Sequence, residues 1–107
     1  MNRIEALYSF INEEDMVVDV GCDQAKLGLM LAKRGQKSIA SDRSINVIDR
    51  AKHDLGRNKY IDLRVSDGLE NIKEGEADTL VLAGMGTHTM LEILNHSFFL
   101  LIYYDNY

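Results

Sequence analysis

Hydrophobic and polar residues follow helical and strand periods in turn along the chain. Apolar residues recur at helical spacing between Ile4 and Ile11, which predicts an amphipathic helix over residues 3–13. Residues 16–20 are valine-rich and apolar on both faces, as a buried parallel strand is, and this apolar run breaks at Gly21. The chain is therefore expected to open with a helix followed by a strand.

The same alternation continues along the chain. A helix that carries Leu27, Met30 and Leu31 is expected to end at Gly35, and a strand follows over residues 38–41. The next helix is capped by Ser44 and carries Ile45, Ile48, Ala51 and Leu55, and it precedes a strand over residues 60–65 with the charged character of a sheet edge. A short helical turn before Gly75 then leads to a buried strand over residues 79–83, with a helix after it. This order predicts an α/β fold in which an open parallel sheet is joined by right-handed helical crossovers. Ligands of such sheets bind at the carboxyl ends of the strands, so function is expected in those loops.

Composition narrows the class of protein. With 107 residues, one Cys and no Pro, the chain is expected to be a single domain over residues 1–107 without an internal disulfide. No apolar run is long enough to span a membrane, so no membrane partner and a cytoplasmic setting are expected. A net charge of −5 argues against a stand-alone nucleic-acid binder. Bases nevertheless cluster within residues 43–64, which are either a solvated helix face or a contact for RNA.

The loop after the first strand carries Asp19, Gly21, Cys22 and Asp23. Gly21 permits a tight turn, in which backbone N–H groups and the next helix N-terminus are expected to face a nucleotide-like ligand. The G-x-G-x-x-G pattern of dinucleotide sites is missing, because Asp23 stands at the second glycine. An acid there repels a pyrophosphate and suits an ammonium or sulfonium group, which favours S-adenosylmethionine over NAD. The alternative is an ordinary strand-to-helix turn with solvated acids.

Acidic residues also follow the second and third strands. Asp42 ends the second strand, where nucleotide-binding α/β domains place an acid that accepts from both ribose hydroxyls. Asp67 can accept from an adenine amine, and Gly68 beside it allows a ring to approach the backbone. Each acid alone is more often a helix cap, but the three loops together predict one nucleoside site.

The loop after the fourth strand begins at Ala83 and contains Gly84, Met85 and Gly86. Its two glycines allow a planar ring to lie close to the main chain, and the Met offers an adaptable apolar wall. The alternative is a flexible turn. His88 follows this loop and is a lesser candidate for contact with a substrate.

Two further kinds of site are not expected. Cys22 has no His partner in an adjacent motif, so it is read as a loop residue and not as a nucleophile. His53, His88 and His96 lack metal-ligand spacing with Cys22 or with one another, so no metal site is expected.

Several segments carry a specific family resemblance. They are Arg3-Ile4, Asp19-Val20-Gly21-Cys22-Asp23, Ile39-Ala40-Ser41-Asp42, Asp67-Gly68-Leu69-Glu70, and Gly75-Glu76-Ala77-Asp78 leading into Leu82-Ala83-Gly84-Met85-Gly86. On these residues the chain, from residue 3 to about 94, resembles the bacterial tRNA (adenine-22)-N1-methyltransferase family. The resemblance implies a Rossmann-like class I methyltransferase fold with an incomplete open parallel sheet, S-adenosylmethionine as cofactor, and tRNA methylated at N1 of an adenine as substrate.

The candidate site residues form two groups. The candidate catalytic residues are Asp23, Gly84, Met85 and Gly86, and the candidate cofactor-binding residues are Asp19, Gly21, Cys22, Asp23, Asp42, Asp67, Gly68 and Ala83. N1 of adenine keeps a lone pair near neutral pH, so its attack on a sulfonium methyl needs positioning more than a strong base. A carboxylate such as that of Asp23 near the methyl path would stabilise positive charge at both ends of the transfer.

The chain departs from the family at Gln24, Lys26, Gly28 and Thr87, where the family usually has His, an aromatic residue, Pro and Gly. If that His or Gly acts on the target base, turnover is affected while cofactor binding need not be. Family members also continue into further strands and a helical domain thought to help hold tRNA. The first alternative to an active methyltransferase is therefore a truncated remnant that binds S-adenosylmethionine without turnover. The second is a nucleotide-binding oxidoreductase domain, which is less compatible with Asp23.

Residues 97–107 resemble nothing in the family and are an atypical tail. Their apolar run, residues 98–104, is either a fifth strand added to the four or an out-of-frame or truncated end. In the family's sheet order the fourth strand is internal, so its edge must pair with this run or with another molecule. Self-association through the tail is the expectation, and an ordered tail strand is the intramolecular alternative.

Overall fold

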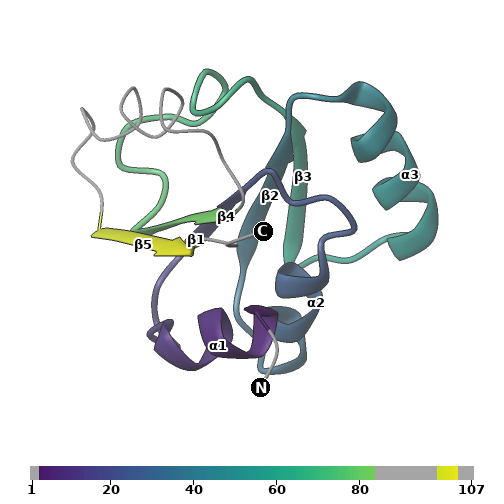
Figure 1. Cartoon of the computed structure of the whole chain (residues 1–107). Coiled ribbons are helices and arrows are strands. Elements are labelled where there is room, and N and C mark those ends of the chain that lie inside the picture. Colours follow the sequence, from purple (N-terminus) through teal and green to yellow (C-terminus); the bar gives the residue numbers. More distant parts are fainter. Residues whose placement is uncertain (1–2, 84–98, 104–107) are drawn as a thin grey trace.

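The computed structural model describes residues 3–83 and 99–103, which form a five-stranded parallel sheet with helices packed against it (Figure 1). The elements are α1 (Arg3–Phe10), β1 (Val17–Val20), α2 (Lys26–Lys33), β2 (Ser38–Asp42), α3 (Ile45–Leu55), β3 (Ile61–Val65), β4 (Thr79–Ala83) and β5 (Phe99–Tyr103). The α/β class and the parallel sheet predicted from the alternation are confirmed.

The strand order is β3-β2-β1-β4-β5, so the chain runs outward from β1 to β3 and then crosses to the other side of β1. The sheet therefore has a switch point between β1 and β4, the position at which open α/β sheets bind ligands. Val20 pairs with Ser41 on one side and with Leu82 on the other, and Asp42 pairs with Val65. This register brings the carboxyl ends of β3, β2, β1 and β4 to the same edge of the sheet.

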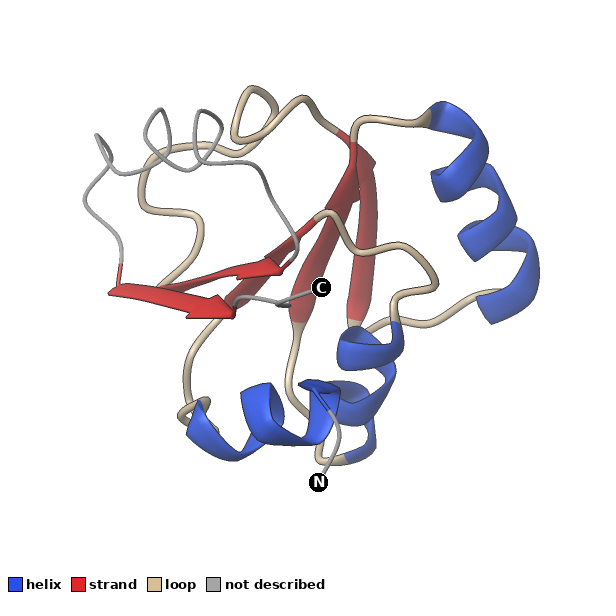
Figure 2. Ribbon diagram, in the orientation of Figure 1, coloured by secondary structure: helices blue, strands red, loops and turns tan. Residues whose placement is uncertain are grey.

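Alternate residues of the central strands pack on opposite faces of the sheet. On one face Val17 and Val81 lie against α1 and α2, through Leu7 and Leu31 among others. On the opposite face the core consists of Val18, Val20, Ile39, Ala77, Leu80 and Leu82, with Met16, Leu69 and Ile72 packed against it. The helices of the described residues cover the first face, as Figure 2 shows, and the segment between β3 and β4 covers the second. Burial on both faces explains why β1 and β4 are mostly apolar, with Asp19 as the buried acid of β1.

One predicted helix is longer than the helix found, and the short helical turn predicted before Gly75 forms separate turns. α1 ends at Phe10, although the apolar spacing predicted helix to residue 13. The Asn12 side chain accepts from the Glu14 backbone N–H at 3.0 Å, a local turn contact that competes with helical hydrogen bonds. The segment before Gly75 forms separate turns rather than a helix, with Glu70 N–H donating to the Asp67 carbonyl and Ile72 N–H to that of Leu69.

The apolar run in the tail forms β5, which pairs in parallel with β4 along its whole length, from Thr79 with Phe99 to Ala83 with Tyr103. The intramolecular alternative therefore covers the edge of β4, and self-association of the chain stays a prediction. The helix expected after β4 falls on residues outside the described ranges. Within residues 3–83 and 99–103, no helix has the length and apolar character needed to cross a membrane.

Candidate functional site

The loop between β1 and α2 adopts an unusual backbone. Gly21 has φ 78°, Asp23 φ 50° and Ala25 φ 57°, so three of five consecutive residues are left-handed. Only the first of these is a glycine, and such strain at residues with side chains is typical of functional sites. Ala25 is buried and Asp23 is exposed, so the strained turn lifts the Asp23 carboxylate away from the core.

Backbone N–H groups at the start of this loop are hydrogen-bonded within the protein. The N–H groups of Gly21 and Cys22 both donate to the Ser41 carbonyl, at 2.8 and 2.9 Å. The Cys22 carbonyl in turn accepts from the Ala25 N–H at 2.8 Å. The end of β2 therefore holds the N–H groups of Gly21 and Cys22, and the expectation that backbone N–H groups of this loop face a ligand stays a prediction. The loop is instead fixed beside Asp42, the residue that follows Ser41.

Negative charge converges on the buried thiol of Cys22. Burial, followed by the nearby negative charges of Asp19, Asp42 and Asp23, raises the pKa of this thiol to about 12. The Asp19 side chain lies inside the protein, 6% exposed, whereas that of Asp42 is half-buried. The structure thus brings three predicted site acids from two loops into one electrostatic neighbourhood. A thiol that stays protonated at neutral pH is no nucleophile, which agrees with the reading of Cys22 as a loop residue.

Asp23 and Gln24 separate two cavities at this edge. A cavity of about 120 Å³ lies between α1 and the loop, and its lining residues are Ile4, Leu7, Asp19, Gly21, Cys22, Asp23, Gln24, Lys26 and Leu27. A second depression of about 340 Å³ lies between Asp23 and α3 and includes Asn46 and Arg50. Gln24 therefore faces the same two cavities as the candidate acid Asp23.

Asp42 lies at the end of β2 and supports the start of α3 without capping it. One of its carboxylate oxygens accepts from the Ser44 N–H at 3.0 Å, while the Ser44 hydroxyl caps α3 by accepting from the Val47 N–H at 3.3 Å. The predicted Ser44 cap is confirmed. A carboxylate offers about four acceptor positions, so the turn contact leaves Asp42 able to accept from a ligand.

The loop after β3 is held by Ser66, whose side chain is buried. The Ser66 hydroxyl donates to the Gly68 carbonyl at 2.9 Å and accepts from the Asn71 N–H at 3.0 Å. Gly68 has φ 59°, a left-handed conformation that favours glycine, and Asp67 beside it is exposed. Sequence reasoning gave Ser66 no role, although a Ser at the start of a Gly-containing turn is a known signal of this contact.

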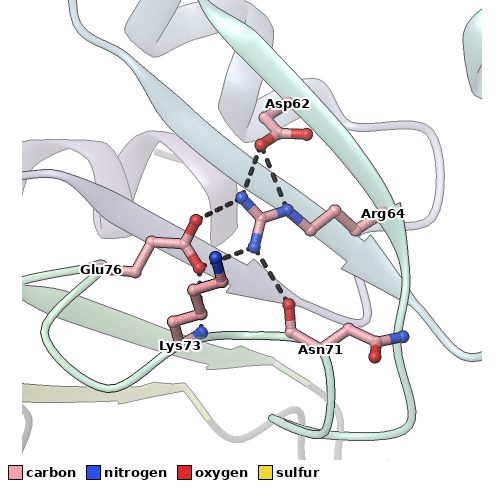
Figure 3. A network of polar contacts seen from close by, with 5 residues as sticks. All are labelled: Asp62, Arg64, Asn71, Lys73 and Glu76. Atoms are coloured by element: carbon pink, nitrogen blue, oxygen red, sulfur yellow. Dashed lines mark hydrogen bonds and ion pairs between the residues drawn. The ribbon is translucent and has the colours of Figure 1, made fainter.

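Arg64 on β3 ties the same loop to the sheet (Figure 3). Its guanidinium pairs with the carboxylates of Asp62 and Glu76 and donates to the Asn71 carbonyl at 3.0 Å. Glu76 also accepts from the Lys73 N–H at 2.9 Å. Arg64 was grouped with the bases of residues 43–64 as a solvated or RNA-contacting residue. That reading is wrong for Arg64, whose donors bind the chain itself.

The ion pair between Arg64 and Glu76 makes the stability of the fold depend on pH. The Arg64 guanidinium, followed by the Lys73 N–H, lowers the pKa of Glu76 from 4.5 to about 2. A lowered folded-state pKa stabilises the fold above pH 4.5, and this stability is lost as the pH falls from 4.5 towards 2. We expect Glu76→Gln to lower the free energy of unfolding at neutral pH by about 1 kcal/mol and to flatten its decline in this window.

The measurement is urea unfolding between pH 2.5 and pH 7. The matched control is Glu74→Gln, which removes one carboxylate from an exposed position of the same segment. An equal loss in both variants would show that net charge, and not the ion pair, sets the acid sensitivity.

Of the remaining predicted site residues, the structure describes only Ala83. Ala83 is the last residue of β4, next to the carboxyl end of β1, whereas Gly84, Met85, Gly86 and His88 lie outside the described residues. Within the described part of the chain, no group of three or more His, Cys, Asp or Glu side chains is placed to hold a metal ion.

Comparisons with known proteins find methyltransferases among the relatives of this chain. The tRNA (adenine(22)-N(1))-methyltransferase of Bacillus subtilis is 33% identical over 97 residues, which cover 86% of this chain and 41% of that protein. The structure of M. capricolum TrmK in complex with S-adenosyl-homocysteine has a TM-score of 0.76 and 27% identity, over 91% of this chain and 46% of that one. Streptococcus pneumoniae Sp1610 in complex with S-adenosyl-L-methionine has a TM-score of 0.75 and 28% identity, over 87% and 46%.

The chain spans less than half the length of these relatives. A family model described as a methyltransferase domain matches residues 1–104, which is nearly the whole chain. The Rossmann-like parallel sheet and its switch point fit this match. The chain belongs to the methyltransferase-domain family.

Proposed function

We propose that this chain binds S-adenosylmethionine across the carboxyl ends of β3, β2 and β1 and is the cofactor-binding part of a tRNA adenine-N1 methyltransferase. The observation that carries the proposal is the order of acidic loops along this edge: Asp67 after β3, Asp42 at the end of β2, and Asp19 and Asp23 around the end of β1. Neighbouring strands are about 4.8 Å apart, so these loops span about 10 Å.

The order of the loops matches the order of chemical groups in the ligand. Asp67 and Gly68 would receive the adenine, Asp42 the ribose hydroxyls, and the acids around Cys22 the positively charged methionine end. The Coulomb effect of Asp19, Asp42 and Asp23 on one thiol supports this, because a site that disfavours an extra negative charge favours a positive one. Ala83 would lie beside the ligand, at the neighbouring strand end.

The chemistry needs little from the protein beyond placement. Bound S-adenosylmethionine would supply an electrophilic methyl group, and N1 of the adenine its own lone pair. Asp23, exposed between two cavities, would stabilise positive charge on the methyl path and hold the reacting groups in line. The target base must leave its stack to reach this edge, and Gly84, Met85 and Gly86 are proposed to receive it.

The tRNA part of the proposal is supported by the relatives, whose names specify a tRNA adenine as their target. A cytoplasmic setting belongs to the same proposal. Since this chain corresponds to less than half of each relative, we expect the 107 residues to bind cofactor well and to methylate tRNA poorly or not at all. Their net charge of −5 also opposes a polyanion.

The experiment incubates the chain with labelled S-adenosylmethionine and unmodified bacterial tRNA at low salt, where attraction between charges is strongest. Cofactor binding is measured in the same sample by calorimetry. We expect binding without appreciable turnover. Robust incorporation at N1 of one adenine would show that these residues suffice for catalysis, and absence of cofactor binding by the folded chain would contradict the proposed function.

A further inference from the structure

A groove lies at the opposite end of the molecule from the acidic loops. It has a volume of about 380 Å³ and lies between α2 and the segment that joins α3 to β3. The side chains of Leu29, Ala32 and Tyr60 are half-buried along it, and Lys33, Arg57 and Lys59 line it with exposed side chains. Tyr60 directly precedes β3, and its carbonyl accepts from the N–H at the start of β2, so the groove lies at the amino ends of these strands.

No acidic side chain neutralises the three cations of this basic groove, as far as the described residues show. Within the described residues, Lys33, Arg57 and Lys59 have no ion pair and no side-chain hydrogen bond, and no acid lines the groove. The Lys59 ammonium lies 5.2 Å from the centre of the Tyr60 ring, and both residues line the groove. Arg34 and Arg64, by contrast, are engaged with Gln36 and Glu76. Positive charge is thus left unneutralised here, in a chain of net charge −5.

The lining suits a nucleic-acid strand. Lys and Arg side chains bind phosphate oxygens, and an aromatic ring with adjacent apolar side chains provides a surface for a base. Asn58 adds an amide, whose oxygen already accepts from the Tyr60 N–H at 3.0 Å, so its amino group remains to donate. Lys33 lies in the last turn of α2, where a cation also offsets the helix dipole, but Arg57 and Lys59 lie beyond both helices.

We propose that the basic groove binds the phosphate backbone of the substrate RNA, at the sheet end opposite the cofactor loops. This inference rests on the proposed function, which supplies an RNA as the partner. The eight residues of α2 separate the two ends by about 12 Å, so one tRNA can contact both. Within residues 43–64, the RNA contacts are thereby assigned to Arg57 and Lys59, and Arg64 is excluded.

The test compares two triple variants with the same change in net charge. The groove variant carries Lys33→Gln, Arg57→Gln and Lys59→Gln. The matched control carries Arg43→Gln, Lys52→Gln and Lys73→Gln, which replace exposed bases outside the groove. Binding of fluorescently labelled, unmodified tRNA is followed by anisotropy between 50 and 200 mM salt, and S-adenosylhomocysteine binding by calorimetry.

We expect the groove variant to lose at least tenfold more tRNA affinity than the control. Its plot of log affinity against log salt should become shallower by about 2–3, as three lost phosphate contacts require. Equal losses in both variants would overturn the proposal, and so would wild-type binding of poly-glutamate as tight as that of tRNA. Cofactor binding is read separately, so its failure would reject the proposed function and not the groove.

Discussion

S-adenosylhomocysteine, at a hundredfold excess over its dissociation constant, is expected to raise the melting temperature of this chain by about 10 °C or more. A ligand that binds only the folded state stabilises it by about 2.7 kcal/mol at this excess. In a domain of about 100 residues, each kcal/mol corresponds to about 4–8 °C. The measurement is thermal unfolding followed by circular dichroism, with and without the ligand.

NAD is the control ligand for this experiment. Both molecules contain an adenosine, but NAD brings a pyrophosphate towards Asp23, in a loop where Gly21 and Cys22 have already given their N–H groups to Ser41. We expect no shift with NAD at the same concentration. A larger shift with NAD would favour the oxidoreductase alternative over the methyltransferase reading.

Asp42→Asn is expected to weaken S-adenosylhomocysteine binding tenfold to a hundredfold. The loss of a charged hydrogen bond to a ribose hydroxyl costs about 1.5–3 kcal/mol, which corresponds to this range. Asn keeps an oxygen that can accept from the Ser44 N–H, so the turn before α3 is preserved. Calorimetric titration gives the affinity of each variant.

Asp49→Asn is the matched control, because it removes one exposed carboxylate from α3 without altering a predicted contact. It should bind the ligand with unchanged affinity. If Asp42→Asn also binds as the unaltered chain does, Asp42 is not part of the site. If both variants bind more weakly to the same extent, the ligand responds to overall charge and not to a contact with Asp42.

The strands were the most predictable part of the fold. A strand buried on both faces is mostly apolar, and the predicted segments at residues 16–20 and 79–83 match β1 (Val17–Val20) and β4 (Thr79–Ala83) closely. Helix ends were less predictable, because apolar spacing continues past Phe10 whereas the Asn12 side chain favours a turn. The tail strand was less predictable, because an out-of-frame or truncated end can carry the same kind of apolar run.

The site was predictable to the extent that it depends on acids placed after strands. Asp19, Asp23 and Asp42 do converge, as loops at one edge of a parallel sheet must. The use of the Ser41 carbonyl by two N–H groups was not predictable, since a backbone acceptor leaves no trace in residue type. The pairing of Arg64 with Glu76 joins residues 12 apart across a loop, and only the folded chain shows it.

A titration of the isotope-labelled chain with S-adenosylhomocysteine, followed by two-dimensional amide NMR, tests most directly whether the carboxyl edge is the cofactor site. The account predicts that the largest changes in amide signals occur together at residues 21–25, 42–44 and 66–68. Residues 57–60, in the basic groove at the opposite end, should remain unchanged. Changes centred on residues 57–60, or no changes in a folded sample, would contradict it.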